Sequence, residues 1–203
     1  MKITFAHHPF DAYAVALYHD EVVKAALDHL QLQETLNINL LLYAIWHGQI
    51  QRGRLHKQDM KALLQNVRAW HERVLVELQR LKHLSQTHAK TNVAPIRDAI
   101  AKEISHAEKI ERCLIADTLL KLNYHRRNPT QQLTDACYNI THYCNALHLR
   151  IDEEDKKAIA ILLQASFPNL IAAEISDICE NSLNNSNTSS TDNSFSQLSL
   201  DKI

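Results

Sequence analysis

The strongest pattern of apolar residues along the chain has the spacing of a long α-helix. Apolar residues recur at steps of 3, 4, 3, 4, 4 and 3, at Met60, Leu63, Val67, Trp70, Val74, Leu78 and Leu81. Residues three or four apart share one face of a helix, so this spacing predicts a helix of about 25 residues. A second stripe of similar length runs from Val93 to about Asn123, after a polar link at 84–90. Because each stripe must be covered, the two helices are predicted to pack antiparallel.

A different pattern precedes this pair, in a segment that is apolar on almost all sides. Residues 37–48 read Asn-Ile-Asn-Leu-Leu-Leu-Tyr-Ala-Ile-Trp-His-Gly. A helix that is hydrophobic all round is typical of one surrounded by other elements. Asn37 is predicted to cap its start and Gly48 its end. A buried strand is the alternative, but scarce turn residues and helical patterns on both sides favour a central buried helix.

Shorter helical patterns fill the rest of the chain up to residue 183. Each of the first four begins at a proline or at a capping side chain, at Pro9, Asp20, Pro129 and Asp152. The pattern from Pro129 extends to Ile151, the pattern from Asp152 extends to Phe167, and a short segment covers 169–183. The sequence therefore predicts one all-α domain over residues 1–183. We expect a bundle of six to eight helices, with a long antiparallel pair and a buried central helix.

The composition changes at Asn184. Residues 184–203 consist mostly of Asn, Ser, Thr and Asp, and their apolar residues are Phe195, Leu198, Leu200 and Ile203. Such a segment buries too little apolar surface to offset the entropy lost on ordering. It is therefore predicted to be a disordered tail, and docking of its apolar end onto a partner groove is the alternative.

Glycine content and charge narrow the classes of fold and partner. The 203 residues include 2 Gly and 4 Pro, and the formal net charge is -1. Strand-rich folds need glycine at hairpin turns and Rossmann folds need it around a pyrophosphate, so both are disfavoured. Gly48 and Gly53 have P-loop spacing, but Arg54 and Leu55 replace the Lys and Ser/Thr that bind phosphate and magnesium. With a charge near zero, nucleic-acid binding is not expected.

The expected compartment is the cytoplasm. The N-terminus has no apolar run of signal-peptide length, and no segment has the roughly 20 apolar residues that span a bilayer. The four cysteines form no Cys-x-x-Cys pair and lie among apolar residues. They are therefore interpreted as buried thiols in a reducing compartment.

Histidine is the commonest metal ligand in proteins, and the chain contains 13 histidines. A di-iron bundle takes a Glu-x-x-His motif from each of two helices, and this chain has one such motif, Glu103 and His106. The prediction is a solvated surface pair with no bound metal or cofactor, and metal binding at Glu103 and His106 is the alternative. Cys144 and His148, at i and i+4, are likewise assigned to a core helix. No residue set indicates a catalytic nucleophile.

Two polar groups in the central helix need partners if they are buried, the Asn39 amide and the Trp46 indole. Asn39 is predicted to bond to a neighbouring helix, and the alternative is that it lines a pocket or a partner groove. Asn39, Tyr43, Trp46 and Trp70 together form the candidate binding surface.

The chain resembles the proteobacterial family called domain of unknown function 2390 in three consecutive segments. These are the string from Asn37 to Trp46, the Gly-containing loop that follows it and the long helix with Trp70. The acidic stretch from Glu103 to Glu111 is similar to the family's second long helix, and the resemblance covers about Phe5 to Asn123. It implies an all-helical bacterial cytosolic protein and no particular chemistry.

The preferred functional hypothesis is a non-enzymatic interaction protein. It would bind an unknown protein partner or a second copy of itself, through one face of the long pair or through the tail. A small-ligand or metal-binding helical protein with a histidine-lined pocket is the alternative.

Overall fold

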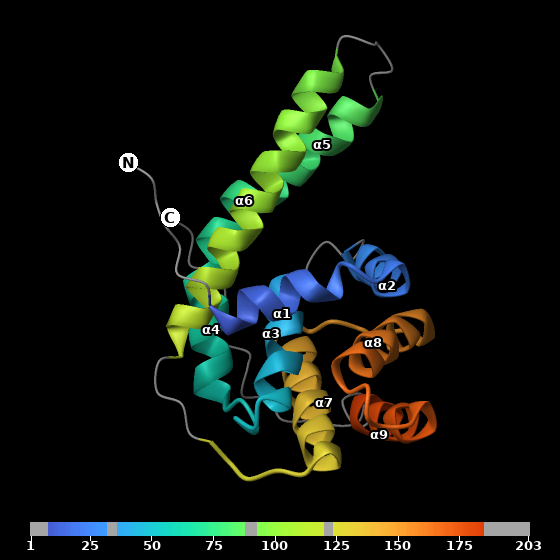
Figure 1. The fold of residues 1–203 in the computed structure, drawn as a ribbon. Helices are drawn as coiled ribbons and strands as arrows, with labels where there is room; N and C mark the ends of the chain where they lie inside the picture. The colour runs from blue at the N-terminus through green and yellow to red at the C-terminus, as the bar shows by residue number, and fades with distance from the viewer. Residues whose placement is uncertain (1–7, 32–35, 88–92, 120–123, 185–203) are drawn as a thin grey trace.

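The computed structural model describes residues 8–31, 36–87, 93–119 and 124–184. These residues form helices and connecting segments without any strand, so the all-α prediction is confirmed (Figure 1). The elements are α1 (Pro9–Leu17), α2 (Glu21–Gln31), α3 (Ile38–Gln49), α4 (Lys57–Trp70), the π-helical turn η1 (His71–Leu75), α5 (Val76–Thr87), α6 (Ala94–Thr118), α7 (Pro129–Ala146), α8 (Glu153–Ser166) and α9 (Ala172–Asn184). Because α4, η1 and α5 are continuous, the described ranges contain eight separate helices, within the predicted six to eight.

The centre of the fold is α3, as the all-round apolar segment predicted. Every residue from Ile38 to Gly48 is buried, and the Asn37 side chain caps the helix by accepting a hydrogen bond from the Leu40 amide. The main neighbour of α3 is α7, and α1, α6 and α8 also pack against it. The core therefore surrounds one helix.

Gly48 has a different role from the predicted C-cap, because α3 continues beyond it to Gln49. A Cβ atom at Gly48 would lie 2.6 Å from the backbone nitrogen of Ala136 on α7. Glycine is needed here because the two helix backbones come too close for any side chain. Gly53, with φ of 78°, lies in the segment that connects α3 to α4.

The long antiparallel pair is confirmed, with α4, η1 and α5 on one side and α6 on the other. Figure 1 shows α5 and the facing part of α6 projecting from the other helices. The helix formed by α4, η1 and α5 is longer than predicted. It continues to Thr87, through part of the polar link that was expected at residues 84–90. The apolar spacing did not predict the π-helical turn η1 within this helix.

Of the helices after residue 128, α7 and α8 pack against α3, and α9 packs against α7 and α8. The end of α7 at Ala146 corrects the predicted end at Ile151, since His148 adopts a positive φ of 54° that an α-helix cannot continue through. The predicted cap of α8 is confirmed, because Asp152 accepts hydrogen bonds from the amides of Glu154 and Asp155. The predicted tail, apart from Asn184, lies outside the described residues.

None of the helices in the described part of the chain combines the length and apolar character needed to cross a lipid bilayer.

Candidate binding site

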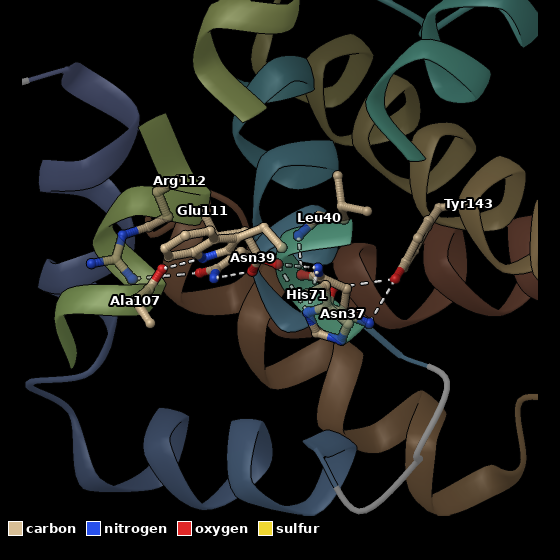
Figure 2. A network of polar contacts seen from close by, with 9 residues as sticks. Asn37, Asn39, Leu40, His71, Ala107, Glu111, Arg112 and Tyr143 are labelled. Carbon is tan, nitrogen blue, oxygen red and sulfur yellow. Dashed lines mark hydrogen bonds and ion pairs between the residues drawn. The ribbon is translucent and has the colours of Figure 1, made fainter. Parts of the chain in front are cut away.

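A charged side chain lies inside the bundle where α6 passes the start of α3. Glu111 is fully buried, and its carboxylate accepts hydrogen bonds from Nδ2 of Asn37 at 2.9 Å and from Nδ2 of Asn39 at 2.6 Å. Figure 2 shows both amides turned toward it. Removing a carboxylate from water costs several kcal/mol unless donors replace the lost water. The two amides supply such donors.

The contacts of the two side-chain oxygens determine how the amide groups of Asn37 and Asn39 are oriented. Oδ1 of Asn37 accepts the Leu40 amide at 3.1 Å, and Oδ1 of Asn39 lies 3.5 Å from Nη1 of Arg112. With both oxygens facing donors, each NH₂ group must face Glu111. Asn39 therefore bonds across to a neighbouring helix, which is the role the sequence analysis favoured for it.

His71 joins the network from the π-helical turn. Its Nδ1 lies 2.9 Å from Oε1 of Glu111 and 2.9 Å from Nδ2 of Asn37. Because a buried carboxylate attracts donors, we assign a proton to Nδ1 and a hydrogen bond from it to Glu111. The His71 side chain is 20% exposed, so it connects the buried carboxylate to the surface. Such π-helical turns occur frequently at functional sites.

Two further residues, Arg112 and Tyr143, tie the network to neighbouring helices. Arg112 donates from Nε to Oδ1 of Asp11 at 2.7 Å, which ties α1 to α6. The Tyr143 hydroxyl accepts from the Asn37 amide at 2.8 Å and donates to the Asn37 carbonyl at 3.2 Å. Burial raises the pKa of Tyr143, so its hydroxyl keeps the proton that it donates. The polar groups thus link four helices and the π-helical turn (Figure 2).

A cavity of about 440 Å³ lies beside this network. Four network side chains form its polar floor: Asn37, Asn39, His71 and Glu111. The rest of its lining is Tyr18, Gln31, Leu36, Ile38, Leu75, Val76, Gln79, Arg80 and Glu108. Val76 and Arg80 are exposed, so the cavity reaches the surface on the side of α5.

Two of the lining side chains have unused hydrogen-bonding capacity. Glu108 lies one helical turn before Glu111, and burial raises the pKa of its carboxyl, an effect that the Arg112 guanidinium opposes. Burial, together with the Glu108 carboxylate, also raises the pKa of Tyr18. Within the described part of the chain, no hydrogen bond reaches the Glu108 carboxylate or the Tyr18 hydroxyl. Both groups can therefore bind a ligand.

The candidate binding surface from the sequence is not one surface. Asn39 lines the cavity, whereas Tyr43 is fully buried and Trp46 is 4% exposed. Both rings pack in the core, where they contact Phe10. Trp70 lies on the long helix, and its Nε1 donates to the Ala107 carbonyl at 3.0 Å. Tyr43 and Trp46 thus support the fold and present no exposed face to a partner.

The predicted surface pair lies on the outer side of α6. Nδ1 of His106 is 3.6 Å from Oε2 of Glu103, and both side chains are more than half exposed. Cys144 is buried on α7, but the helix ends before His148.

A group of metal-ligating side chains that sequence analysis missed lies where α2 meets α8. The ligand atoms of His29, Asp152 and Asp155 lie within 4.8 Å of one another. Asp152 and Asp155 already accept hydrogen bonds from backbone amides at the start of α8, and His29 contacts Asp155 at 3.1 Å. The two aspartates therefore cap the start of α8, and His29 contacts one of them.

The important site residues Tyr18, His71, Glu108 and Glu111 were also missed. One signal was present for Glu111, because it continues the stripe of buried residues Ile104 and Ala107 toward Ile115 at steps of 3, 4 and 4. A charged residue in the middle of an apolar stripe indicates a buried polar partner.

Comparison with models of protein families places this chain in one of them. The family model described as "Protein of unknown function (DUF2390)" matches residues 10–117. The chain belongs to this family. Asn37, Asn39, His71 and Glu111 all lie inside the DUF2390 match, whereas α7, α8 and α9 lie beyond it. No curated protein and no solved structure matches the chain.

Proposed function

We propose that this DUF2390 protein binds a small organic cation in the cavity beside Glu111. The supporting observation is that the cavity presents Glu108 and Tyr18, two polar side chains without hydrogen-bond partners in the described chain, next to a buried carboxylate. The volume of about 440 Å³ falls among those of small-molecule sites, which run from about 300 to 1,000 Å³. The apolar wall would contact the carbon skeleton of the ligand.

The charges around the cavity favour a cation over an anion. Glu108 and Glu111 both line it, while the nearby Arg112 is paired with Asp11. Arg80, at the opening, is paired with Glu77 at 3.0 Å. An ammonium or guanidinium group could donate to the Glu108 carboxylate and to the Tyr18 oxygen, while an anion would face two carboxylates.

The same contacts favour binding over catalysis. Both carboxylate oxygens of Glu111 already hold hydrogen bonds from Asn37, Asn39 and His71. A group held in this way forms a fixed floor that orients a ligand.

The experiment measures the melting temperature of the full chain with small amines and guanidines, such as putrescine, agmatine and methylguanidine. Binding to the folded state should raise the melting temperature with ligand concentration. Glu108→Gln should abolish this increase. The matched control is Glu103→Gln, on the exposed side of the same helix, which should retain it. No increase with any cation, or an equal increase in Glu108→Gln, contradicts the proposal.

The proposed setting is the cytoplasm of a bacterial cell, as the family resemblance implies. Cys113, Cys137, Cys144 and Cys179 are all free thiols. Free buried thiols are typical of a reducing compartment.

A further inference from the structure

We propose that two copies of this chain associate through the arm, which we define as residues 70–87 and 94–110. The arm comprises Trp70, η1, α5 and the facing part of α6. The second copy lies antiparallel on the first. The side of the arm that forms this interface shares no lining residue with the cavity, and the proposal does not depend on the proposed ligand.

The arm has one apolar side that no other described part of the chain covers. A groove of about 360 Å³ runs along it. Its apolar lining consists of Trp70, Val74, Leu78, Leu81, Ala107 and Ile110. Its charged or polar lining, which we call the rim, consists of Arg73, Glu77, Glu103 and His106. Apolar patches rimmed by polar residues mark interaction sites.

The uncovered side follows from the construction of the arm. Two helices share one buried seam, which here contains Leu75, Ile104 and Ala107. Leu81 and Ile96 are 44% and 55% exposed. When two such helix pairs pack together they form a four-helix bundle, and the apolar side chains between the pairs become buried.

The charged rim indicates what covers the groove. Leu75 and Ile104 belong to the same buried cluster between the antiparallel helices, and we take them as lying at the same level. In this register Arg73 lies level with His106, and Glu77 lies within one residue of the level of Glu103. The two levels are about 6 Å apart along the helix axis, at about 1.5 Å per residue. Nitrogen groups therefore occupy one level of the rim, and carboxylates occupy the next.

A second antiparallel copy matches this rim. A two-fold axis between the two levels places Arg73 of each copy opposite Glu77 of the other, and His106 opposite Glu103. A parallel second copy would instead place carboxylates opposite carboxylates. Charges of both signs also argue against a nucleic acid, which requires a row of cations. The rim is thus complementary to itself in the antiparallel arrangement.

The experiment measures the molar mass of the full chain by light scattering and sedimentation over a range of concentrations. The wild-type chain should form a dimer that dissociates on dilution. Arg73→Glu places like charges opposite one another at two points of the interface, and so does Glu77→Arg. Each variant alone should weaken the dimer by about tenfold or more.

A mixture of these two variants provides the decisive comparison. In a dimer containing one copy of each, every contact between positions 73 and 77 again joins opposite charges, so the mixture should dimerise where neither variant does alone. The double variant Arg73→Glu with Glu77→Arg should dimerise like the wild type for the same reason. Failure of both to recover association contradicts the antiparallel arrangement.

The apolar part of the groove is tested by Leu78→Lys, which should give a monomer. The control is Val22→Lys, at an exposed position on α2 away from the arm, which should remain dimeric. Circular dichroism checks that each variant is folded. If Leu78→Lys fails to fold, the charge variants still decide, because their side chains lie on the rim. A wild-type monomer at every concentration, or a dimer that none of these variants weakens, overturns the proposal.

Discussion

Glu111 has an environment in which almost any other side chain would be unfavourable. Its two oxygens face the amide groups of Asn37 and Asn39 and the imidazole of His71. A hydrocarbon side chain at this position would leave these donors buried without an acceptor. The residue therefore determines how α3, α6 and η1 fit together as well as how the cavity floor is charged.

Glu111→Gln should lower the free energy of unfolding by about 1 to 3 kcal/mol. The new NH₂ group would face Nδ2 of Asn37 or Asn39, so two donors would meet where a donor and an acceptor met before. Urea denaturation midpoints measure the effect. Glu21→Gln, at an 85% exposed side chain on α2 outside the arm, serves as a control and should change stability by less than about 0.5 kcal/mol. Equal midpoints for the two variants would show that the buried carboxylate contributes nothing.

Trp46→Ala should cost about 3 to 5 kcal/mol, because it removes a large buried side chain and leaves a cavity. The indole lies 5.5 Å from the Phe10 ring and 5.6 Å from the Tyr43 ring, with the Arg52 guanidinium 4.8 Å from its centroid. Most domains have about 5 to 15 kcal/mol of total stability, so the variant should be marginally folded or insoluble. A soluble variant with an unchanged denaturation midpoint would contradict the core assignment.

His47 should make the fold sensitive to acid. Burial lowers the pKa of His47 from 6.5 to about 4, and its imidazole lies 3.2 Å from the Gly53 carbonyl. Between these two pH values the unfolded chain binds a proton that the folded chain does not, so stability falls as the pH falls. The loss should approach about 3 kcal/mol at pH 4.

Denaturation midpoints of the wild type and His47→Gln, measured from about pH 7.5 down to about pH 4.5, test this prediction. The variant lacks the titrating group, so its stability should depend less steeply on pH even if it is less stable throughout. Parallel pH profiles would exclude His47 as the cause.

At the scale of elements, the π-helical turn η1 joins α4 to α5 in one continuous helix. The turn η1 closes with a hydrogen bond from the Val76 amide to the His71 carbonyl, five residues back. This longer turn agrees with the two successive steps of four from Trp70 to Val74 to Leu78. It also positions His71 toward Glu111 while α5 keeps its apolar face on α6.

The crossing of α3 and α7 gives an element-level prediction at Gly48. Alanine normally stabilises a helix relative to glycine by about 1 kcal/mol, but here its Cβ would lie 2.6 Å from the Ala136 backbone nitrogen. The helices would have to move apart, so Gly48→Ala should instead destabilise the protein by about 1 to 3 kcal/mol. Thermal melting measures the sign directly. A more stable variant would contradict the close approach of the two helices.

The whole molecule is larger than the region that defines its family. The DUF2390 match ends at residue 117, yet α3 buries its surface against α7. The side chains of α7 in this contact region are almost wholly buried, among them Leu133, Ala136 and Ile140. The family match therefore covers only part of the hydrophobic core.

A fragment of residues 1–118 should accordingly not fold as a cooperative unit. Without α7, one side of α3 would expose its apolar side chains to water, and this burial is a main source of stability. The expected result is a helical fragment with a broad thermal transition and binding of a hydrophobic dye. Residues 1–184 provide the control and should melt sharply. A cooperative transition in the shorter fragment would contradict this account.

Local chemistry determined most of the secondary structure of this protein. Proline, asparagine and aspartate mark the starts of α1, α3, α7 and α8 because capping involves residues within one helical turn. Apolar spacing revealed the long pair and the central helix, since the helix period relates residues that are neighbours in the chain. The burial of Trp46 followed from the same pattern.

Only the tertiary structure decided the cavity, the role of Gly48 and the end of α7. Glu111 meets its amide partners across 72 and 74 residues of chain, and His71 across 40. No local periodicity relates positions so far apart. Their meeting depends on how α3, α6 and η1 pack, and on the requirement that a carboxylate removed from water finds donors inside the protein.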